Sequence, residues 1–193
     1  MADPLDEYFT RTVAALTPGQ PGDTDTDLLA LFDAQLGSRH LDFTARELVR
    51  QGRGFYSIGS AGHEGDAAVA AVLRPTDPVL PHYRSGAFYL ARAGQVPGHE
   101  PLRDVLLGVT AAADEPIAGG RHKVFGNKAL HIIPQTSTIA SHLPRAVGLA
   151  FGIERARKLG RPTEWPADAI VVCGFGDAST NHSTATGAFN AAA

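Results

Sequence analysis

A turn near the end of the chain carries the clearest chemical signal. Residues 174–181 read Gly-Phe-Gly-Asp-Ala-Ser-Thr-Asn and directly follow an apolar, β-branched run at residues 169–173. Small residues let the backbone approach a diphosphate, but a carboxylate beside two phosphates is repelled. A bridging cation removes this conflict, so Asp177 is predicted to bind Mg²⁺, with diphosphate oxygens among the other ligands. The alternative is that Asp177 only caps the following helix.

Residues 81–86 read Pro-His-Tyr-Arg-Ser-Gly, and they are a candidate site because of the family resemblance given below. Arg84 has a planar guanidinium that can donate to phosphate oxygens in two directions. The alternative is a surface arginine at the start of a helix, where a cation is mildly unfavourable because of the helix dipole. This small penalty favours a binding role for Arg84.

Other kinds of site are disfavoured by residue type and spacing. The eight histidines show no spacing typical of zinc hydrolases, and Cys173 is the only cysteine, so neither an intramolecular disulfide nor a cysteine-based metal site is expected. A dinucleotide site of the Gly-x-Gly-x-x-Gly type is also disfavoured, because Asp177 would stand where a neutral approach to the diphosphate is needed.

These residues must be positioned by the elements around them. Residues 169–173 predict a strand buried on both faces of a parallel sheet, and residues 139–159 predict a long helix with Pro144 in its first turns. Residues 183–193 begin another helix. Helix, buried strand, small-residue turn and helix indicate an α/β fold with a doubly wound parallel sheet, in which ligands bind beyond the carboxyl ends of the strands.

The rest of the chain predicts mainly helices. Turn-forming residues 17–27 follow a short leading helix, so residues 1–26 are predicted to form an N-terminal extension and linker, and residues 27–193 one domain. A helix pair is expected from residue 27 to 50, followed by helices at 64–73, 85–93 and 102–110, with a short strand at 79–80. Residues 94–135 are otherwise expected to be rich in loops.

Composition excludes several partners. The 193 residues carry a formal charge of −3 with a pI near 6.2, which lacks the basic excess expected of a nucleic-acid-binding protein. No segment approaches about 18 continuous apolar residues, and the first residues do not resemble a signal peptide. We therefore expect a cytoplasmic protein that binds neither nucleic acid nor membrane.

Several of these segments resemble a known family. Residues 176–179, Gly-Asp-Ala-Ser, with Phe-Asn-Ala-Ala at 189–192, resemble the opening of the Gly-Asp-Gly thiamine-diphosphate motif in alpha-type subunits of 2-oxo acid dehydrogenases. Ala178 replaces the last glycine, which is tolerable if its φ stays negative. The family's motif closes with an asparagine pair further along. The resemblance therefore implies a diphosphate-binding domain that is incomplete at its C-terminus.

The resemblance implies roles for individual residues. Tyr83, Arg84, Gly176, Asp177, Ala178 and Ser179 would contact the cofactor diphosphate and its Mg²⁺, and Ser137 and Ile139 would hold the aminopyrimidine ring. Ser137 and Ser141 could also coordinate K⁺, although either could instead cap the following helix. His63, which replaces the glutamine of a Gly-Gln-Glu run, and His142, in a Ser-His-x-Pro run, are the candidate catalytic residues; a structural role is the alternative for His63.

The implied reaction is decarboxylation of a 2-oxo acid with acyl transfer to a lipoyl group. The implied partners are a pyrimidine-binding beta-type domain or subunit, which supplies the activating glutamate, a lipoyl-bearing acyltransferase and the 2-oxo acid substrate, within an oligomer. A transketolase-like or acetoin-cleaving enzyme is the alternative within the cofactor class. A non-catalytic assembly domain of the same fold is the alternative outside it.

Overall fold

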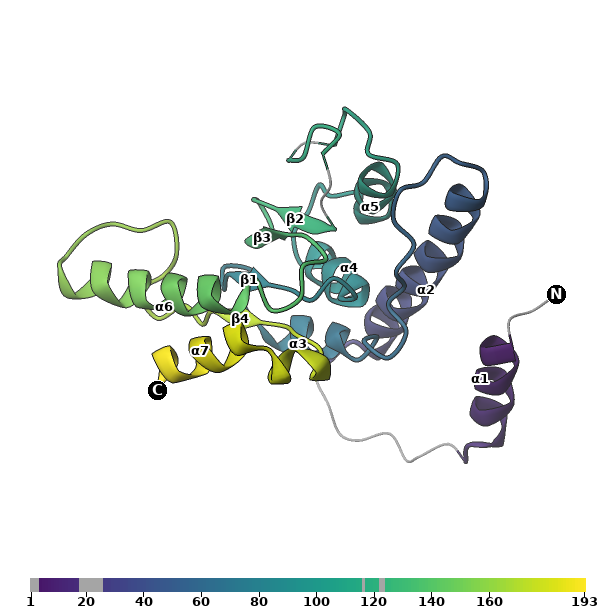
Figure 1. The fold of residues 1–193 in the computed structure, drawn as a ribbon, viewed down its shortest axis with the longest axis horizontal. Helices are drawn as coiled ribbons and strands as arrows, with labels where there is room; N and C mark the ends of the chain where they lie inside the picture. Colours follow the sequence, from purple (N-terminus) through teal and green to yellow (C-terminus); the bar gives the residue numbers. More distant parts are fainter. Residues whose placement is uncertain (1–3, 18–25, 116, 122–123) are drawn as a thin grey trace.

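The computed structural model describes residues 4–17, 26–115, 117–121 and 124–193, so most of the predicted linker lies outside the described residues. Helix α1 (Pro4–Ala15) confirms the short leading helix and is set apart from the other elements (Figure 1). Within the described ranges, no helix is long and apolar enough to cross a membrane.

The chain forms an α/β fold around a small mixed sheet. Its strands are β1 (Val79–Leu80), β2 (Phe125–Asn127), β3 (Ile132–Gln135) and β4 (Val172–Cys173), in the order β2-β3-β1-β4. Strand β1 is parallel to β3 and β4, but β2 is antiparallel to β3. The prediction of a purely parallel sheet is therefore wrong at this edge, while the doubly wound topology stays a prediction.

The antiparallel edge arises from a hairpin within the predicted loop region. The Asn127 side chain turns the chain, because its Oδ1 accepts hydrogen bonds from the backbone N–H groups of Ala129 (3.0 Å) and Leu130 (3.3 Å). Two strands joined by so short a connection can pair only in the antiparallel sense. Both strands are too short to give a clear periodic signal, which is why the sequence did not reveal them.

Helices pack on both faces of β4. Val172 packs with the cluster of Ala70, Val79 and Phe88, which joins α3 (Asp66–Val72) and α4 (Gly86–Gly94) to β1. The next residue, Cys173, points to the opposite face, because side chains alternate along a strand, and packs with α6 (Leu143–Lys158) and α7 (Ser183–Ala192).

Strand β4 is less buried than its apolar sequence predicts. Val172 and Cys173 are only half-buried and Ile170 is 59% exposed, so helices contact both faces of this strand but the expectation that it is fully buried is wrong. The reason is topological: β4 forms the outer edge of the sheet and pairs on one side only, with β1.

Helix α2 (Leu28–Arg50) runs unbroken where a helix pair was expected. Asp27 caps its start by accepting hydrogen bonds from the N–H groups of Leu29 and Ala30, both at 3.0 Å. The small residues Gly37 and Ser38 do not break the helix. They let it approach α4 closely, since Ser38 is only 1% exposed and a Cβ on Gly86 would lie 2.4 Å from its Oγ. Helix α5 (Pro101–Val109) contacts both α2 and α4.

Candidate functional site

The register of two strands brings the predicted site together. Val79 and Leu80 of β1 pair with Val172 and Cys173 of β4, and the Gly174 N–H donates to the Leu80 carbonyl at 3.0 Å. Because the strands are parallel, their carboxyl ends lie together, and residues 81–84 and 174–177 leave these ends side by side. Ligands of open parallel sheets bind at the carboxyl ends of the strands.

A cavity of about 250 Å³ lies at the carboxyl ends of β1 and β4. It gathers segments that are far apart in the sequence and includes most of the residues expected to contact the cofactor. Its lining consists of His63, His82, Tyr83, Arg84, Ile139, Gly176, Asp177, Ala178 and Ser179. The gathering of these side chains is a result of the tertiary structure, while their individual roles remain predictions.

The Asp177 side chain is exposed at the cavity and is not used as a helix cap. Asp177 begins the short 3-10 helix η1 (Asp177–Asn181), whose cap position, Gly176, makes no side-chain hydrogen bond. Helix α7 is capped instead by His182, whose Nδ1 accepts from the Thr184 N–H at 3.2 Å. Among the described residues, the Asp177 carboxylate has no recorded hydrogen-bond partner. It is therefore available to a cation.

Arg84 is held at the border of the cavity. Its Nη1 donates to the Gly59 carbonyl at 2.7 Å, and its guanidinium lies 5.4 Å from the centre of the Tyr83 ring. This arrangement fixes one edge of the guanidinium and leaves Nε and Nη2 without a recorded partner among the described residues. The free edge of a fixed guanidinium is suited to an anion.

His82 was not predicted from the sequence as a site residue, yet it lies in the wall of the cavity. Its ring stacks on His63 with 4.6 Å between ring centres and lies 3.9 Å from the Tyr83 ring. The side chain is only 4% exposed, and burial, with smaller effects of neighbouring cationic groups, lowers the pKa of His82 to about 4. The ring is therefore neutral at pH 7. The available signal was its position directly after the strand at 79–80.

The glycine turn fits closely around His82. A Cβ on Gly174 would lie 3.1 Å from the His82 backbone nitrogen, and one on Gly176 would lie 3.3 Å from His82 Nε2. A side chain at either position would therefore require His82 to shift by a few tenths of an ångström. Ala178 is not among the residues with positive φ, so the turn does not require glycine there. An aspartate, a free guanidinium edge and a turn of small residues at Gly176, Ala178 and Ser179 form a cradle that fits a diphosphate with its cation.

The loop before α6 places only part of its predicted residues at the cavity. Ile139 lines it and is 48% exposed, whereas Ser137 is half-buried outside the lining. The Ser141 hydroxyl donates to the Thr138 carbonyl at 2.9 Å, and α6 begins only at Leu143 without a side-chain cap. The helix therefore starts later than expected, and the capping alternative for the two serines is wrong.

His142 lies behind the cavity wall rather than on it. The ring is 4% exposed, and its Nε2 lies 2.6 Å from the Gly174 carbonyl, which ties the start of α6 to the turn after β4. Burial is the main cause that lowers the pKa of His142. His142 thus contacts the turn that follows β4 and does not line the cavity itself. The catalytic role predicted for it stays a prediction. His63, by contrast, lines the cavity, with its Nδ1 3.8 Å from the Asp66 carboxylate.

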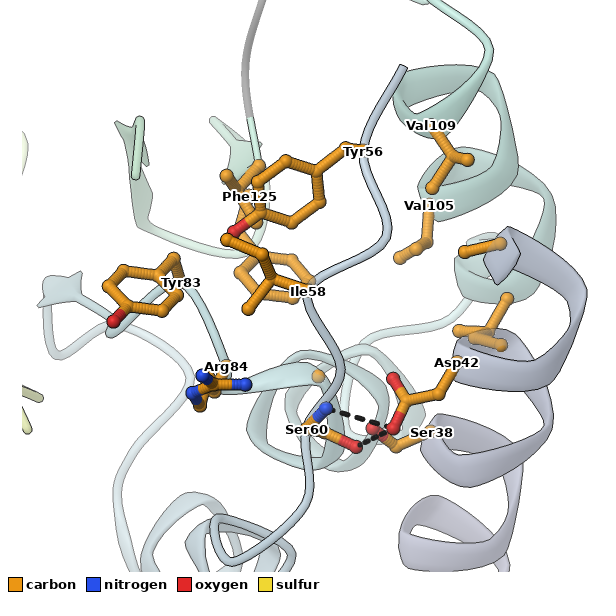
Figure 2. A pocket seen from close by; sticks show the side chains of 14 residues that line it. Ser38, Asp42, Tyr56, Ile58, Ser60, Tyr83, Arg84, Val105, Val109 and Phe125 are labelled. Carbon is orange, nitrogen blue, oxygen red and sulfur yellow. Dashed lines mark hydrogen bonds between the residues drawn. The ribbon is translucent and has the colours of Figure 1, made fainter. Parts of the chain in front are cut away.

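A second, apolar pocket of about 40 Å³ adjoins the cavity, since both are lined by Tyr83 and Arg84 (Figure 2). The other labelled apolar side chains around it come from α5, β2 and the segment after α2: Tyr56, Ile58, Val105, Val109 and Phe125. At its lower side, Asp42 accepts hydrogen bonds from the Ser60 N–H (2.8 Å) and hydroxyl (2.9 Å), which fixes the segment that carries Ile58.

Comparison with known proteins places this site in a family. The family model of the dehydrogenase E1 component matches residues 33–193, which include every residue of the cavity. The chain belongs to the dehydrogenase E1 component family. The family depends on thiamine diphosphate, which agrees with the cradle described above.

Curated relatives of this E1 chain are alpha subunits. It is 29% identical over 155 residues to the mitochondrial 2-oxoisovalerate dehydrogenase subunit alpha of Mus musculus, covering 79% of this chain and 32% of the relative. It is 28% identical over 164 residues to the subunit of the same name in Bacillus subtilis, covering 83% and 45%. A mitochondrial subunit alpha 2 of Arabidopsis thaliana is 29% identical over 148 residues, covering 76% and 28%. The chain thus spans less than half the length of these relatives.

Proposed function

We propose that this chain is the diphosphate-binding part of the alpha-type decarboxylating subunit of a branched-chain 2-oxo acid dehydrogenase complex. The observation that carries the proposal is the cavity at the carboxyl ends of β1 and β4, where Tyr83, Arg84 and Asp177 converge. Family membership and the names of the relatives support the reaction class. The same names favour a 2-oxo acid substrate over the transketolase-like and acetoin-cleaving alternatives.

Each side chain of the cradle has a distinct task in this proposal. Asp177 would hold a Mg²⁺ ion that neutralises the diphosphate, and Arg84 and the Tyr83 hydroxyl would donate to phosphate oxygens. Gly176, Ala178 and Ser179 supply a turn that the diphosphate can approach. Ile139 packs against the aminopyrimidine end, with Ser137 beside it, and a K⁺ at Ser137 and Ser141 would stabilise this loop.

Thiamine diphosphate, when bound, supplies the electron sink for loss of CO₂ from the 2-oxo acid. The protein binds and orients it, and the apolar pocket next to Tyr83 is suited to the side chain of the substrate. Its volume of about 40 Å³ favours short aliphatic chains over aromatic ones. The activating glutamate and the lipoyl acceptor come from partners, a beta-type subunit and an acyltransferase.

Binding and turnover of the complete protein with its beta-type partner test this proposal. We expect calorimetry to detect thiamine diphosphate only with Mg²⁺, and decarboxylation of 3-methyl-2-oxobutanoate to depend on lipoamide. Binding without any turnover would favour the non-catalytic assembly domain. Turnover with aldose acceptors but not with lipoamide would favour the transketolase-like alternative, and an absence of binding would contradict the proposal as a whole.

A further inference from the structure

His82 and Ser179 are the two buried polar side chains in the wall of the cavity, and none of the roles assigned above uses His82. It follows β1 directly, and its ring is confined by His63 on one side and by Tyr83 on another, at ring-centre distances of 4.6 and 3.9 Å. These two contacts fix the plane of the ring, and the neighbours at its edge distinguish the two nitrogens. Its two nitrogens therefore have separate environments.

The hydrogen-bond pattern decides which nitrogen carries the proton. The backbone N–H of Arg84 donates to His82 Nδ1 at 3.4 Å, so Nδ1 is the acceptor. A neutral imidazole that accepts at Nδ1 carries its hydrogen on Nε2. Nε2 has no recorded hydrogen-bond partner among the described residues, and it faces the turn at Gly176, since a Cβ there would lie 3.3 Å away.

His82 lines the cavity, and its Nε2 is not among the buried polar atoms that lack a partner, so this donor is open to a ligand in the cavity. We propose that His82 is a cofactor contact, whose Nε2–H donates a hydrogen bond to a diphosphate oxygen held beside Gly176 and Asp177. This inference rests on the proposed function, because the anion is the diphosphate of the same cavity. It adds a neutral donor to the charged groups already assigned, and it accounts for the absence of a side chain at Gly176.

Two substitutions of His82 distinguish the role of Nε2 from that of Nδ1. His82→Gln can place an amide N–H near the position of Nε2, whereas His82→Asn reaches only the position of Nδ1. Because the acceptor is charged, we expect His82→Asn to weaken binding of thiamine diphosphate with Mg²⁺ by roughly 10- to 100-fold in the complete protein. The affinity of His82→Gln should stay within about threefold of wild type. His40→Asn, on the exposed surface of α2, is the matched control and should bind like wild type.

The probe identifies the end of the cofactor that His82 contacts. Magnesium pyrophosphate, measured by calorimetry, should show the same order of affinities, and thiamine without phosphates should show no difference between the variants. Thermal unfolding of the ligand-free variants reports packing alone. If Gln and Asn weaken binding equally, in proportion to their loss of stability, His82 is a packing residue and the inference is wrong.

A measurement on the wild-type protein does not depend on the folding of any variant. In protein with ¹⁵N-labelled histidine, we expect His82 to carry its hydrogen on Nε2, and the Nε2–H resonance to move downfield when thiamine diphosphate and Mg²⁺ bind. An unchanged resonance on binding would overturn the contact. If wild type binds no thiamine diphosphate at all, the function proposed for the cavity fails, which is a different result from equal binding by wild type and His82→Asn.

Discussion

The Asp177 carboxylate projects from a turn with no recorded side-chain partner among the described residues, so its loss should affect binding more than folding. We expect Asp177→Asn to abolish Mg²⁺-dependent binding of thiamine diphosphate in the complete protein, because a neutral amide is a poor replacement for a charged magnesium ligand. The unfolding free energy should change by less than about 0.5 kcal/mol. Calorimetric titration measures the first quantity and urea unfolding the second. Unaltered cofactor affinity would remove Asp177 from the metal site.

Arg84 differs from Asp177 because one of its nitrogens is already committed to the Gly59 carbonyl. Arg84→Lys keeps the charge but loses the planar guanidinium, which can donate two hydrogen bonds to a phosphate. Binding of thiamine diphosphate should therefore weaken by roughly 1–3 kcal/mol. The loss should be smaller for thiamine monophosphate, which lacks the distal phosphate. Equal losses for the two ligands, measured by calorimetry, would show that Arg84 does not distinguish the phosphate end.

The two buried histidines predict how stability depends on pH. Burial lowers the pKa of both His82, to about 4, and His142, so the folded state favours the neutral rings. Their contribution is fully present above the unfolded pKa near 6.5 and is lost as the pH falls towards the folded value. For His82 alone, the unfolding free energy should drop by about 2 kcal/mol between pH 7 and 5. Urea unfolding across this range should show the drop, and it should be smaller in His82→Gln. A slope that is unchanged in this variant would contradict the assignment.

At the scale of elements, contact between α2 and α4 depends on residues that are small on both helices. A Cβ on Gly86 would lie 2.4 Å from Ser38 Oγ, which is buried and has little room to rotate, but 3.5 Å from Ser38 Cβ. We expect Gly86→Ala to lower the unfolding free energy by roughly 1–2 kcal/mol. Adding Ser38→Ala should recover most of this loss, because it removes the atom that clashes.

Gly94, at the other end of α4, is the control for this prediction. A Cβ there would meet nothing within 4 Å, so Gly94→Ala should stabilise the protein by up to about 1 kcal/mol through helix propensity alone. Denaturant unfolding of the three single variants and of the Gly86→Ala/Ser38→Ala double mutant gives the unfolding free energies for a double-mutant cycle. Additive effects of Gly86→Ala and Ser38→Ala would show that the two residues do not determine the approach of the helices.

At the scale of the whole molecule, the described chain carries a large exposed apolar surface beside the outer strand. A cavity of about 390 Å³ lies between α6, β4 and α7, and it is bordered by Phe151, Phe175 and Phe189, which are 65%, 37% and 45% exposed. Among the described residues, strand β4 also has one edge that pairs with no other strand. Exposed apolar surface next to an open strand edge favours association.

We therefore expect the 193-residue chain alone to self-associate and to lack decarboxylase activity, even with saturating thiamine diphosphate, Mg²⁺ and a 2-oxo acid. It supplies groups for the diphosphate, but none of its residues is assigned to activate the pyrimidine ring. Size-exclusion chromatography at several concentrations, with a decarboxylation assay, compares it with the complete protein and the proposed beta-type partner. Turnover by a monomer of this chain would contradict a composite active site.

The sequence alone determined the strands at 79–80 and 172–173 and the main helices, and it predicts the chemistry of the turn at 174–181. Local signals suffice for these features: small residues with one acid, β-branched runs and apolar spacing. Tertiary structure alone decided the rest. The hairpin β2–β3 depends on pairing with β1, α2 stays continuous because α4 packs against its small residues, and His82 belongs to the cavity because β1 and β4 end side by side. Strand pairing, close helix packing and a shared cavity wall each bring together residues that are distant in the sequence. No local sequence pattern can therefore predict these contacts.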